Sequence, residues 1–384
     1  MELNEMSIQV FQIDNDTFEN VGELNQYTSV LWPSKYNGYA ECELWAPITD
    51  DNVELLQQGH VLWKGGDSAF VIEIIEPSTS DDGTKTYHVK GRTLEKYLTQ
   101  RIVWGTYTAT NKHPSTIMYA IVRENCISPN DANRIIPYLV NGTDDMSGTK
   151  TTYQKTGGEV YDALVSIGND SDLGFRVRFD PANTRMVFEV VVGKDRTVNQ
   201  TENEQVKLST ELSDIMSSSY YNSNQQLKNV ALVAGEESGT SSRKRQIAGD
   251  NTTKGITRRE LYVDARDLQS ESTDESGQQV TLSDEEYNKA LIQRGTEKLA
   301  ECQVVETFEA KIRVNQDGMY KFGVDYFEGD KITVEDNELH VVVDAVVSAS
   351  EESYSEESTL QLTFGYERPT LIEKVKQKIA LGNQ

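Results

Sequence analysis

Alternating apolar and polar residues in the first hundred positions predict β-strands. Residues 7–13, Ser-Ile-Gln-Val-Phe-Gln-Ile, alternate as a half-buried strand. In the segment 40–45, Ala40, Cys42 and Leu44 share one face, and the residues between them share the other. Pro33 follows the apolar run Val30-Leu31-Trp32 and predicts a break in the chain. The pattern indicates sheets with one face on a core and the other in water.

A strand–turn–strand unit recurs near the two ends of the chain. The front copy, 59–92, starts at Gly59-His60-Val61, and the back copy, 329–368, starts at Gly329-Asp330-Lys331. In both copies we expect the second strand to begin 11 residues after the glycine. The recurrence predicts one strand topology used twice, and hence pseudo-symmetry. The alternative is that any two β-meanders look alike at this level.

The middle of the chain changes to a mixed helical and strand pattern. Pro114 stands at the first position of a predicted helix, and a second helix is expected from about Glu159 to Gly168-Asn169. Two strands follow, joined by the turn Asp180-Pro-Ala-Asn183. We interpret residues 106–204 as an α+β insertion.

The last third starts with a predicted strand at Val230-Ala-Leu-Val-Ala, followed by a polar, turn-rich segment from Gly235 to Lys254. Ser283 and Glu286 form a capping box that opens a helix ending near Cys302. Pro369 opens a last amphipathic helix that, at about eleven residues, needs a partner surface.

These patterns and the composition predict an α+β, mostly β, multidomain chain. With 384 residues and 37% hydrophobic residues, several small cores fit better than one large core. Cys42, Cys126 and Cys302 are widely spaced, form no CxxC pair, and are expected to be small buried hydrophobes made in a reducing cytoplasm. The first residues lack a signal-peptide pattern, and no apolar stretch is long enough to span a membrane.

The formal net charge of −25 argues against stable nucleic-acid binding, because the phosphate backbone is also negative. A path through which DNA slides without sticking is compatible with this charge, and so is acidity for solubility alone. The one basic concentration is Arg243-Lys244-Arg245 with Lys254, Arg258 and Arg259. It is either a solvated loop or an ion-pair contact between acidic subunits.

No catalytic, cofactor-binding or metal-ligating residue is assigned. The four histidines, His60, His88, His113 and His340, have no HExxH spacing and no nearby cysteine. The segment Gly235-Glu-Glu-Ser238-Gly resembles a nucleophile elbow with one residue too many, and it falls in a loop. Acidic clusters at Asp50-Asp51 and Asp144-Asp145 match no calcium-loop spacing and are expected to be solvated.

Several stretches taken together resemble the hub proteins at the distal end of bacteriophage tails. The family is the N-terminal structural region of siphophage tail-associated lysins, with relatives in contractile-tail baseplates. No single motif is diagnostic, and the resemblance depends on the order of the stretches over nearly the whole chain. They are Trp32-Pro-Ser-Lys-Tyr36-Asn-Gly38, Val89-Lys-Gly91-Arg92-Thr-Leu94, Leu173-Gly-Phe-Arg-Val, Val191-Val-Gly193-Lys-Asp195-Arg196-Thr197, Asn229 to Gly235, Arg259 to Leu268, Gly329-Asp330, and Phe364-Gly365 to Pro369.

The resemblance implies a homotrimer in which each chain contributes two related β-barrel-like hub domains, giving a pseudo-hexagonal ring under a hexameric distal tail protein. The ring would close the tail tube until infection and then let DNA pass without stable binding. Tape measure and receptor-binding proteins are further expected partners. The protein would be a virion component, assembled in the host cytoplasm. Many relatives continue into a cell-wall-cleaving domain, which we expect this chain to lack.

On this basis the expected domains are a first hub β-domain at 1–105, completed by about 205–238, and an α+β insertion at 106–204. A linker and helix-containing segment at 239–302, a second hub β-domain at 303–367 and a C-terminal helix at 368–384 follow. The rival function is a carbohydrate-recognising adhesin or receptor-binding module, which would show exposed aromatics along one groove. A hydrolase with a dispersed site is the least favoured.

Overall fold

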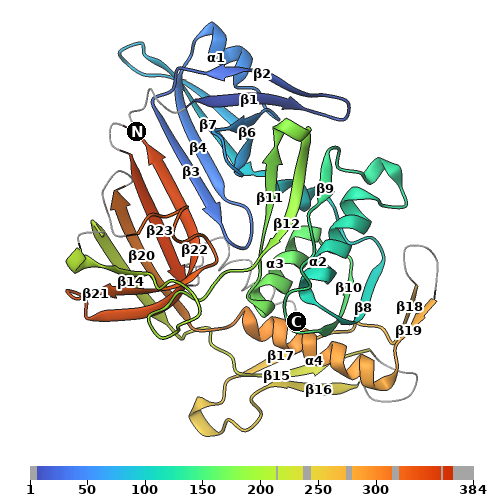
Figure 1. The fold of residues 1–384 in the computed structure, drawn as a ribbon. Coiled ribbons are helices and arrows are strands. Elements are labelled where there is room, and N and C mark those ends of the chain that lie inside the picture. The colour runs from blue at the N-terminus through green and yellow to red at the C-terminus, as the bar shows by residue number, and fades with distance from the viewer. Residues whose placement is uncertain are drawn as a thin grey trace.

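The computed structural model describes residues 7–212, 215–236, 244–273, 279–313, 320–355 and 358–365. Its main feature is a 13-stranded sheet that holds strands from both ends of the chain (Figure 1). Eleven of these strands lie side by side in the order β14-β20-β23-β22-β3-β4-β7-β6-β5-β1-β2, and β21 and β13 attach beside β22. The protein is therefore mostly β, as the alternating pattern predicts.

The first half of the sheet is built from the N-terminal strands. They are β1 (Ile8–Ile13), β2 (Phe18–Leu24), β3 (Ser29–Lys35), β4 (Glu41–Pro47), β5 (Val61–Trp63), β6 (Ala69–Thr79) and β7 (Lys85–Thr93). A short helix α1 (Asp50–Leu55) separates β4 from β5, with Thr49 as its N-cap. We call β3 to β7 the first module. Its strands pair antiparallel in the order β3-β4-β7-β6-β5.

The second half of the sheet repeats this arrangement with later strands. They are β14 (Ser217–Ser223), β20 (Val305–Arg313), β21 (Lys331–Asp336), β22 (Val341–Tyr354) and β23 (Thr359–Gly365), which we call the second module. They pair antiparallel in the order β14-β20-β23-β22-β21. Each strand therefore has a counterpart in the first module, both in chain order and in sheet order. The predicted shared topology of 59–92 and 329–368 is confirmed, and it extends to two further strands.

Backbone details repeat as well. The amide of Gly59 donates to the carbonyl of Ile72 at 2.8 Å, and that of Gly329 donates to the carbonyl of Val347 at 2.9 Å. In both modules the long strand then bulges, between Ile72 and Ile74 in β6 and between Val347 and Ala349 in β22. A bulge at one place in two copies is a property of the unit, because bulges fix twist and register. The second strands begin 10 and 12 residues after their glycines, at Ala69 and Val341, where 11 was expected.

The sheet stays open in the part of the chain that the structure describes, so the two modules are not closed barrels. They join through β3, which pairs with β4 on one side and with the second half of β22 on the other. Pro33 does not break this strand, contrary to the expectation. Pairing with β4 ends at Leu31, so Pro33 lies where a missing amide donor on that side costs nothing.

The α+β insertion follows the first module and shares a core with it. Its strands are β8 (Thr106–Lys112), β9 (Leu139–Asn141), β10 (Thr151–Thr156), β11 (Gly174–Asp180) and β12 (Arg185–Val191), and its helices are α2 (Pro114–Val122) and α3 (Val160–Ser171). Pro114 occupies the first turn of α2, as predicted. Phe179 of β11 packs against Phe11 and Phe18 of the main sheet, with ring centroids 5.0 and 5.5 Å apart. One hydrophobic core therefore spans both parts.

The turn after the first module is a 3-10 helix, Leu94–Gln100. Thr93 precedes it but does not cap it with its side chain. The Thr93 hydroxyl instead accepts the Ala40 amide at 3.0 Å, and Ile102 is exposed. Here tertiary contact took the group that local capping would have used.

A separate small unit interrupts the second module between β14 and β20. It contains β15 (Val230–Ala234), β16 (Arg245–Gly249), β17 (Glu260–Asp264), the hairpin β18 (Glu271–Thr273) and β19 (Gln279–Thr281), and the helix α4 (Asp284–Ala300). The helix packs on the sheet β16-β15-β17, and the unit has its own core around Tyr287 and Leu291 (Figure 1). The Ser283–Glu286 capping box is confirmed. Strand β16 lies inside the segment 235–254, where polar composition predicted only turns.

Residues 205–238, expected to complete the first hub domain, instead contribute strands to the second module. Strand β13 (Lys207–Ser209) pairs with β21, and β14 pairs with β20. We therefore propose assigning 205–223 to the second hub domain. The C-terminal helix expected at 368–384 lies outside the described residues, as do Ser238 and Arg243. Cys42 and Cys126 are free and buried, as expected, and Cys302 is half-buried.

Candidate functional site: a polar sheet face and a three-way junction

One face of the main sheet is polar across both modules. On β4, Cys42, Leu44 and Ala46 are buried while the residues between them are not, so the two faces separate cleanly. Opposed residues on the other face form continuous rows from one module into the next. One row is Ser219, Glu309, Thr363, Ala349 and Lys35, and another is Thr359, Ser353, Leu31, Glu43, Lys90 and Ile74.

Carboxylates on this polar face engage the neighbouring cations. His88 lies between Glu43, 2.6 Å from its Nε2, and Glu76, 3.3 Å from its Nδ1, and it stacks on the Trp45 ring. Lys90 contacts Glu76 at 2.9 Å and lowers the pKa of that carboxyl. These pairs are half-exposed, so each adds little stability, but together they neutralise the face.

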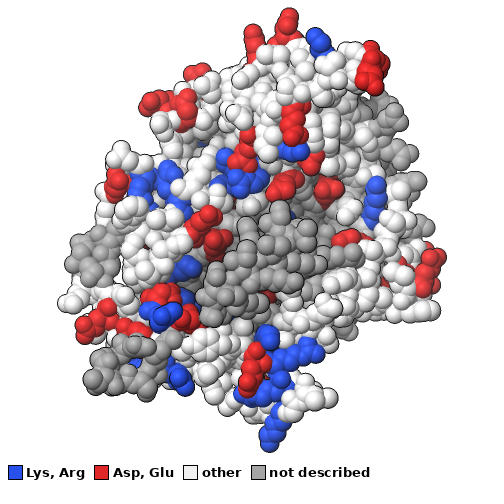
Figure 2. Space-filling model, turned by 180° about the vertical axis from the view of Figure 1, so that it is seen from behind, with Lys and Arg blue, Asp and Glu red and all other residues white. Residues whose placement is uncertain are grey.

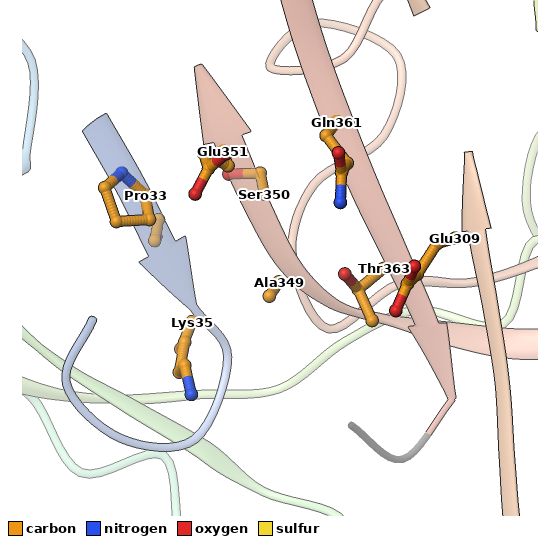
Figure 3. A pocket seen from close by; sticks show the side chains of 9 residues that line it. Pro33, Lys35, Glu309, Ala349, Ser350, Glu351, Gln361 and Thr363 are labelled. Atoms are coloured by element: carbon orange, nitrogen blue, oxygen red, sulfur yellow. The ribbon is translucent and has the colours of Figure 1, made fainter. Parts of the chain in front are cut away.

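The join between the modules carries an open depression of about 220 Å³ on the same face (Figure 3). Glu309, Glu351 and Lys35 line it together with small and polar side chains, and none of its lining residues is aromatic. Burial raises the pKa of Glu351, and the nearby Glu43 charge raises it further. Such a polar, open surface suits water and passing solutes better than a tightly held ligand.

The charges on the polar face nearly balance in the part of the chain that the structure describes. The acidic members are Glu41, Glu43, Glu76, Glu309 and Glu351, and the basic ones are Lys35, Lys90, Arg92 and Lys311. The strong acidity of the whole chain is therefore not concentrated here.

The second feature is a junction where the first module, the insertion and the second module meet around Tyr36. The Tyr36 hydroxyl lies 2.9 Å from the Asp172 carbonyl and 3.1 Å from the Val191 carbonyl, and it accepts the Gly193 amide at 3.3 Å. Burial raises the pKa of this phenol. A side chain at Gly329 would place its Cβ 2.2 Å from the Tyr36 ring, so the ring requires glycine there.

Asp330 secures the same junction by holding three groups. Its carboxylate accepts the Lys194 amide at 2.7 Å, the Arg196 Nε at 2.8 Å and the Phe327 amide at 3.2 Å. The side chains of Asp330 and Arg196 are 6% and 12% exposed, so this is a nearly buried ion pair. Gly193 fits directly beneath, since a Cβ there would lie 1.7 Å from the Gly329 carbonyl oxygen.

The stretches that carried the family resemblance converge at this junction. Tyr36, Gly174, Gly193, Arg196 and Gly329 come from four of them and lie within contact distance of one another or of a shared partner. The sequence showed their order but not this convergence. The only signal was the pairing of special glycines with a charged neighbour.

A buried polar contact joins the α4 unit to the insertion. Arg294 forms two 3.0 Å hydrogen bonds to Asp267, and Gln293 donates to Asp170 at 2.5 Å. Glu297 lies beside them, 6% exposed, and burial raises its pKa to about 7. Arg294 opposes this shift only weakly, because it is 3.8 Å from Glu297 and is already bonded to Asp267. Burial also lowers the pKa of Lys155 and raises that of Asp170 nearby.

The basic residues of segment 244–259 lie on the α4 unit, where Figure 2 shows blue side chains at the lower end of the molecule. Most of them are engaged within the chain. Lys244 pairs with Asp284, Arg258 with Glu260 at 2.6 Å, and Arg259 donates to the Asn224 carbonyl. Between them Ile256 is 99% exposed, which makes this loop a projecting apolar tip with a basic surround.

Catalytic and metal-binding constellations were not expected, and the described residues hold no group of three metal-ligating side chains. His60 and His113 each contact a backbone carbonyl, Leu55 at 2.9 Å and Gly148 at 2.7 Å. Asp144 accepts Ser115 and Thr116 hydroxyls and so orders a loop. No helix in the described part of the chain has the length and apolarity to cross a bilayer.

Comparison with solved structures places the whole architecture among phage tail proteins. A tail protein from Neisseria meningitidis MC58 aligns with a TM-score of 0.54 at 13% identity, covering 94% of this chain and 96% of that one. The 43 kDa tail protein of prophage MuSo2 from Shewanella oneidensis gives 0.53 at 12% identity, covering 93% and 98%. Prophage tail protein gp18 from Listeria monocytogenes EGD-e gives 0.51 at 9%, covering 98% and 100%. At these identities the likeness establishes the fold.

The family assignment comes from the sequence. Residues 8–366 match the family described as Siphovirus ReqiPepy6 Gp37-like protein, so the chain belongs to that family. No curated protein matches the chain. The resemblance to phage tail hub proteins is thereby confirmed for family and fold.

Proposed function

We propose that this protein is a structural hub at the distal tip of a phage tail, where three copies form a ring that closes the tail tube. The family and the fold support a tail component. The observation that carries the ring is the presence of two equivalent five-strand modules in one chain. Three chains then present six similar units, a number that matches a hexameric distal tail protein above them.

In this proposal the polar sheet face lines the channel. Its carboxylates engage cations such as His88 and Lys90, which limits the positive charge available to hold DNA. DNA would pass without stable binding because counterion release needs accessible cations. A strongly acidic lumen was expected, whereas the charges of this face nearly balance. The electrostatic potential of the assembled ring tests the remaining part of that expectation.

The proposed partners are two further copies of the chain, the hexameric distal tail protein, and tape measure and receptor-binding proteins. The basic loop around Ile256 is the proposed contact with a subunit or the distal tail protein, because an exposed apolar tip in a basic surround fits an acidic surface with a small pocket. The protein would reside in the virion, after assembly in the host cytoplasm.

We also propose that the described residues perform no hydrolysis. Purified protein should leave peptidoglycan and cell-wall polysaccharides intact. Cleavage that disappeared on substitution of one serine or carboxylate would contradict this.

The rival function, carbohydrate recognition, draws less support. It requires exposed aromatics along one groove, whereas the exposed rings Trp104, Tyr262 and Phe327 come from the insertion, the α4 unit and the second module. The depression at the module join has no aromatic lining.

The oligomeric state tests the hub proposal directly. Light scattering of the purified chain at micromolar concentration should give three times the chain mass of 43.2 kDa. Particle images should show a ring with six similar lobes. A stable monomer or a dimer would contradict the proposal.

A further inference from the structure

The join between the two modules within one chain is a strand seam. Strand β3 of the first module pairs antiparallel with the second half of β22, from Lys35 opposite Ala349 to Val30 opposite Tyr354. The Tyr36 amide extends it by donating to the Ser348 carbonyl at 2.9 Å. The first half of β22 pairs on the same side with β21, so this long strand is covered along its whole length.

The counterpart of β22 in the first module is only half covered. The first half of β6 pairs with β5, from Ala69 to Val71. Beyond the bulge, Ile74–Thr79 pairs with β7 on one side, and no described strand pairs on the other. Residues 76–79 are all exposed. The first module thus leaves open the site that β3 fills in the second module.

The counterpart of β3 in the second module is β14, and it lies at the end of the sheet. It pairs with β20 and with no other described strand. The equivalence holds in detail. The irregular hydrogen bond at the start of β3, from the Thr28 amide to the Trp45 carbonyl at 2.7 Å, has a match at the start of β14, from the Met216 amide to the Lys311 carbonyl at 2.7 Å.

We propose that β14 of one copy adds to Ile74–Thr79 of a second copy, repeating between chains the seam that β3 and β22 form within one. This inference rests on the proposed ring and specifies its subunit contact. Open edges are sites where a second chain adds a strand. Here each chain has one edge of each kind, so head-to-tail pairing uses both edges, and three copies can close.

The internal seam fixes the register of the proposed one. Matching the bulges makes Ile74 the counterpart of Ala349, and matching the starts of β3 and β14 makes Ser219 the counterpart of Leu31. Leu31 lies opposite Ser353, whose counterpart is Ser78. Ser78 of one copy should therefore lie opposite Ser219 of the next, on the polar face.

Pro77 is the one position where the two seams differ. Its counterpart Glu352 lies opposite Trp32, and the counterpart of Trp32 is Tyr220. Proline lacks an amide donor, so the seam between chains has one hydrogen bond fewer than the internal seam. The Tyr220 ring faces Pro77 in this register and can pack on it. A proline on an open edge also limits pairing with unrelated strands.

Cysteine pairs test this register. We would substitute Ser78→Cys and Ser219→Cys in one chain, in a Cys302→Ser background, since Cys302 is the least buried native thiol. Directly opposed strand residues lie within the distance that a disulfide spans. Under mild oxidation the double variant should run as dimer and trimer on a non-reducing gel, and as monomer after reduction.

Two control pairs use the same chain. Leu31→Cys with Ser353→Cys occupies the equivalent internal position and should form a disulfide within one chain, which peptide mapping detects. Ser78→Cys with Ser223→Cys lies on the same face but four residues out of register along β14, and it should give no linked species.

The outcomes separate this inference from the hub proposal. A trimer by light scattering, with linkage at Ser78 and Ser219 only, supports both. A trimer without that linkage, while the internal pair does link, overturns the strand seam and leaves the hub proposal standing. A monomer by light scattering overturns both.

Discussion

The two modules share strand order, bulge and glycine turn, yet they fill their cores differently. In the first module Phe70 packs beside Gly91, where a Cβ would lie 3.0 Å from the Phe70 ring and 2.0 Å from the Val71 carbonyl oxygen. At the equivalent positions the second module has Ala345 and Phe364, both in its core. A large residue has moved from one strand to the next. A core needs total volume more than residue identity, so the backbone topology persisted while sequence likeness was lost.

The connections differ as much as the cores. Residues 36–40 link the first two strands of the first module, whereas residues 224–304, including the α4 unit, link the equivalent strands of the second. The ladder between β14 and β20 still has the same register as that between β3 and β4. Long insertions at a strand connection cost little, because loop-closure entropy grows slowly with length.

The largest expected difference between the modules concerns the residue after the module glycine. Asp330→Ala should lower the free energy of unfolding by about 3–5 kcal/mol, because it leaves Arg196 nearly buried without its charge partner. His60→Ala, at the equivalent position, loses one contact to the Leu55 carbonyl and should cost about 1 kcal/mol. Urea unfolding followed by tryptophan fluorescence measures both. Equal losses would show that the junction is no more demanding than the first module's turn.

The glycines themselves should come next. Gly59 and Gly329 have φ of +87° and +92°, so alanine is strained at both, by about 1–2 kcal/mol. At Gly59 a Cβ meets nothing within 4 Å, whereas at Gly329 it meets the Tyr36 ring. Gly329→Ala should therefore cost about 1–3 kcal/mol more than Gly59→Ala. The double variant Gly329→Ala with Tyr36→Ala should recover part of that excess, and no recovery would place the strain elsewhere.

A smaller effect is expected where the unit inserted in the second module meets the insertion after the first. The pKa of Glu297 is raised in the folded chain to about 7, so its protonated form is the one the fold favours. The resulting stability is present below about pH 4.5 and is lost as the pH rises through 7. Glu297→Gln should remove that loss and raise stability at pH 8 by on the order of 2 kcal/mol.

Thermal unfolding of the Glu297→Gln variant and the parent, at pH 5 and pH 8, measures this difference. The two proteins should be similar at pH 5 and diverge at pH 8. A constant gap at both values would indicate a packing effect without a role for ionisation.

The smallest expected effects lie at the equivalent carboxylates Glu351 and Glu76. Burial raises the pKa of Glu351, so Glu351→Gln should slightly stabilise the chain at neutral pH. The hydrogen bond from Lys90 lowers the pKa of Glu76, so Glu76→Gln should slightly destabilise it, and only above the acid range. Opposite signs in paired melting curves would sharpen the comparison, because they reflect a covered and an open half of the same strand. Equal signs would contradict it.

Short-range patterns in the sequence were sufficient to predict most elements. Alternation located β1 and β4, Pro114 marked the start of α2, and the Ser283–Glu286 box marked the start of α4. The glycine-to-strand spacing revealed the two copies of the unit. These signals are local, since turn geometry, capping and the period of side-chain exposure depend on neighbouring residues.

Tertiary structure alone decided which strands became neighbours. The polar segment Ser217–Ser223 carries no strong strand pattern, yet it completes the second module because β20 offers a free edge. Strand β3 continues through Pro33 because β22 covers it. The junction of Tyr36, Gly193 and Asp330 joins residues far apart in the chain through close approach of backbones. Such contacts depend on the arrangement of whole elements, which periodicity and spacing do not encode.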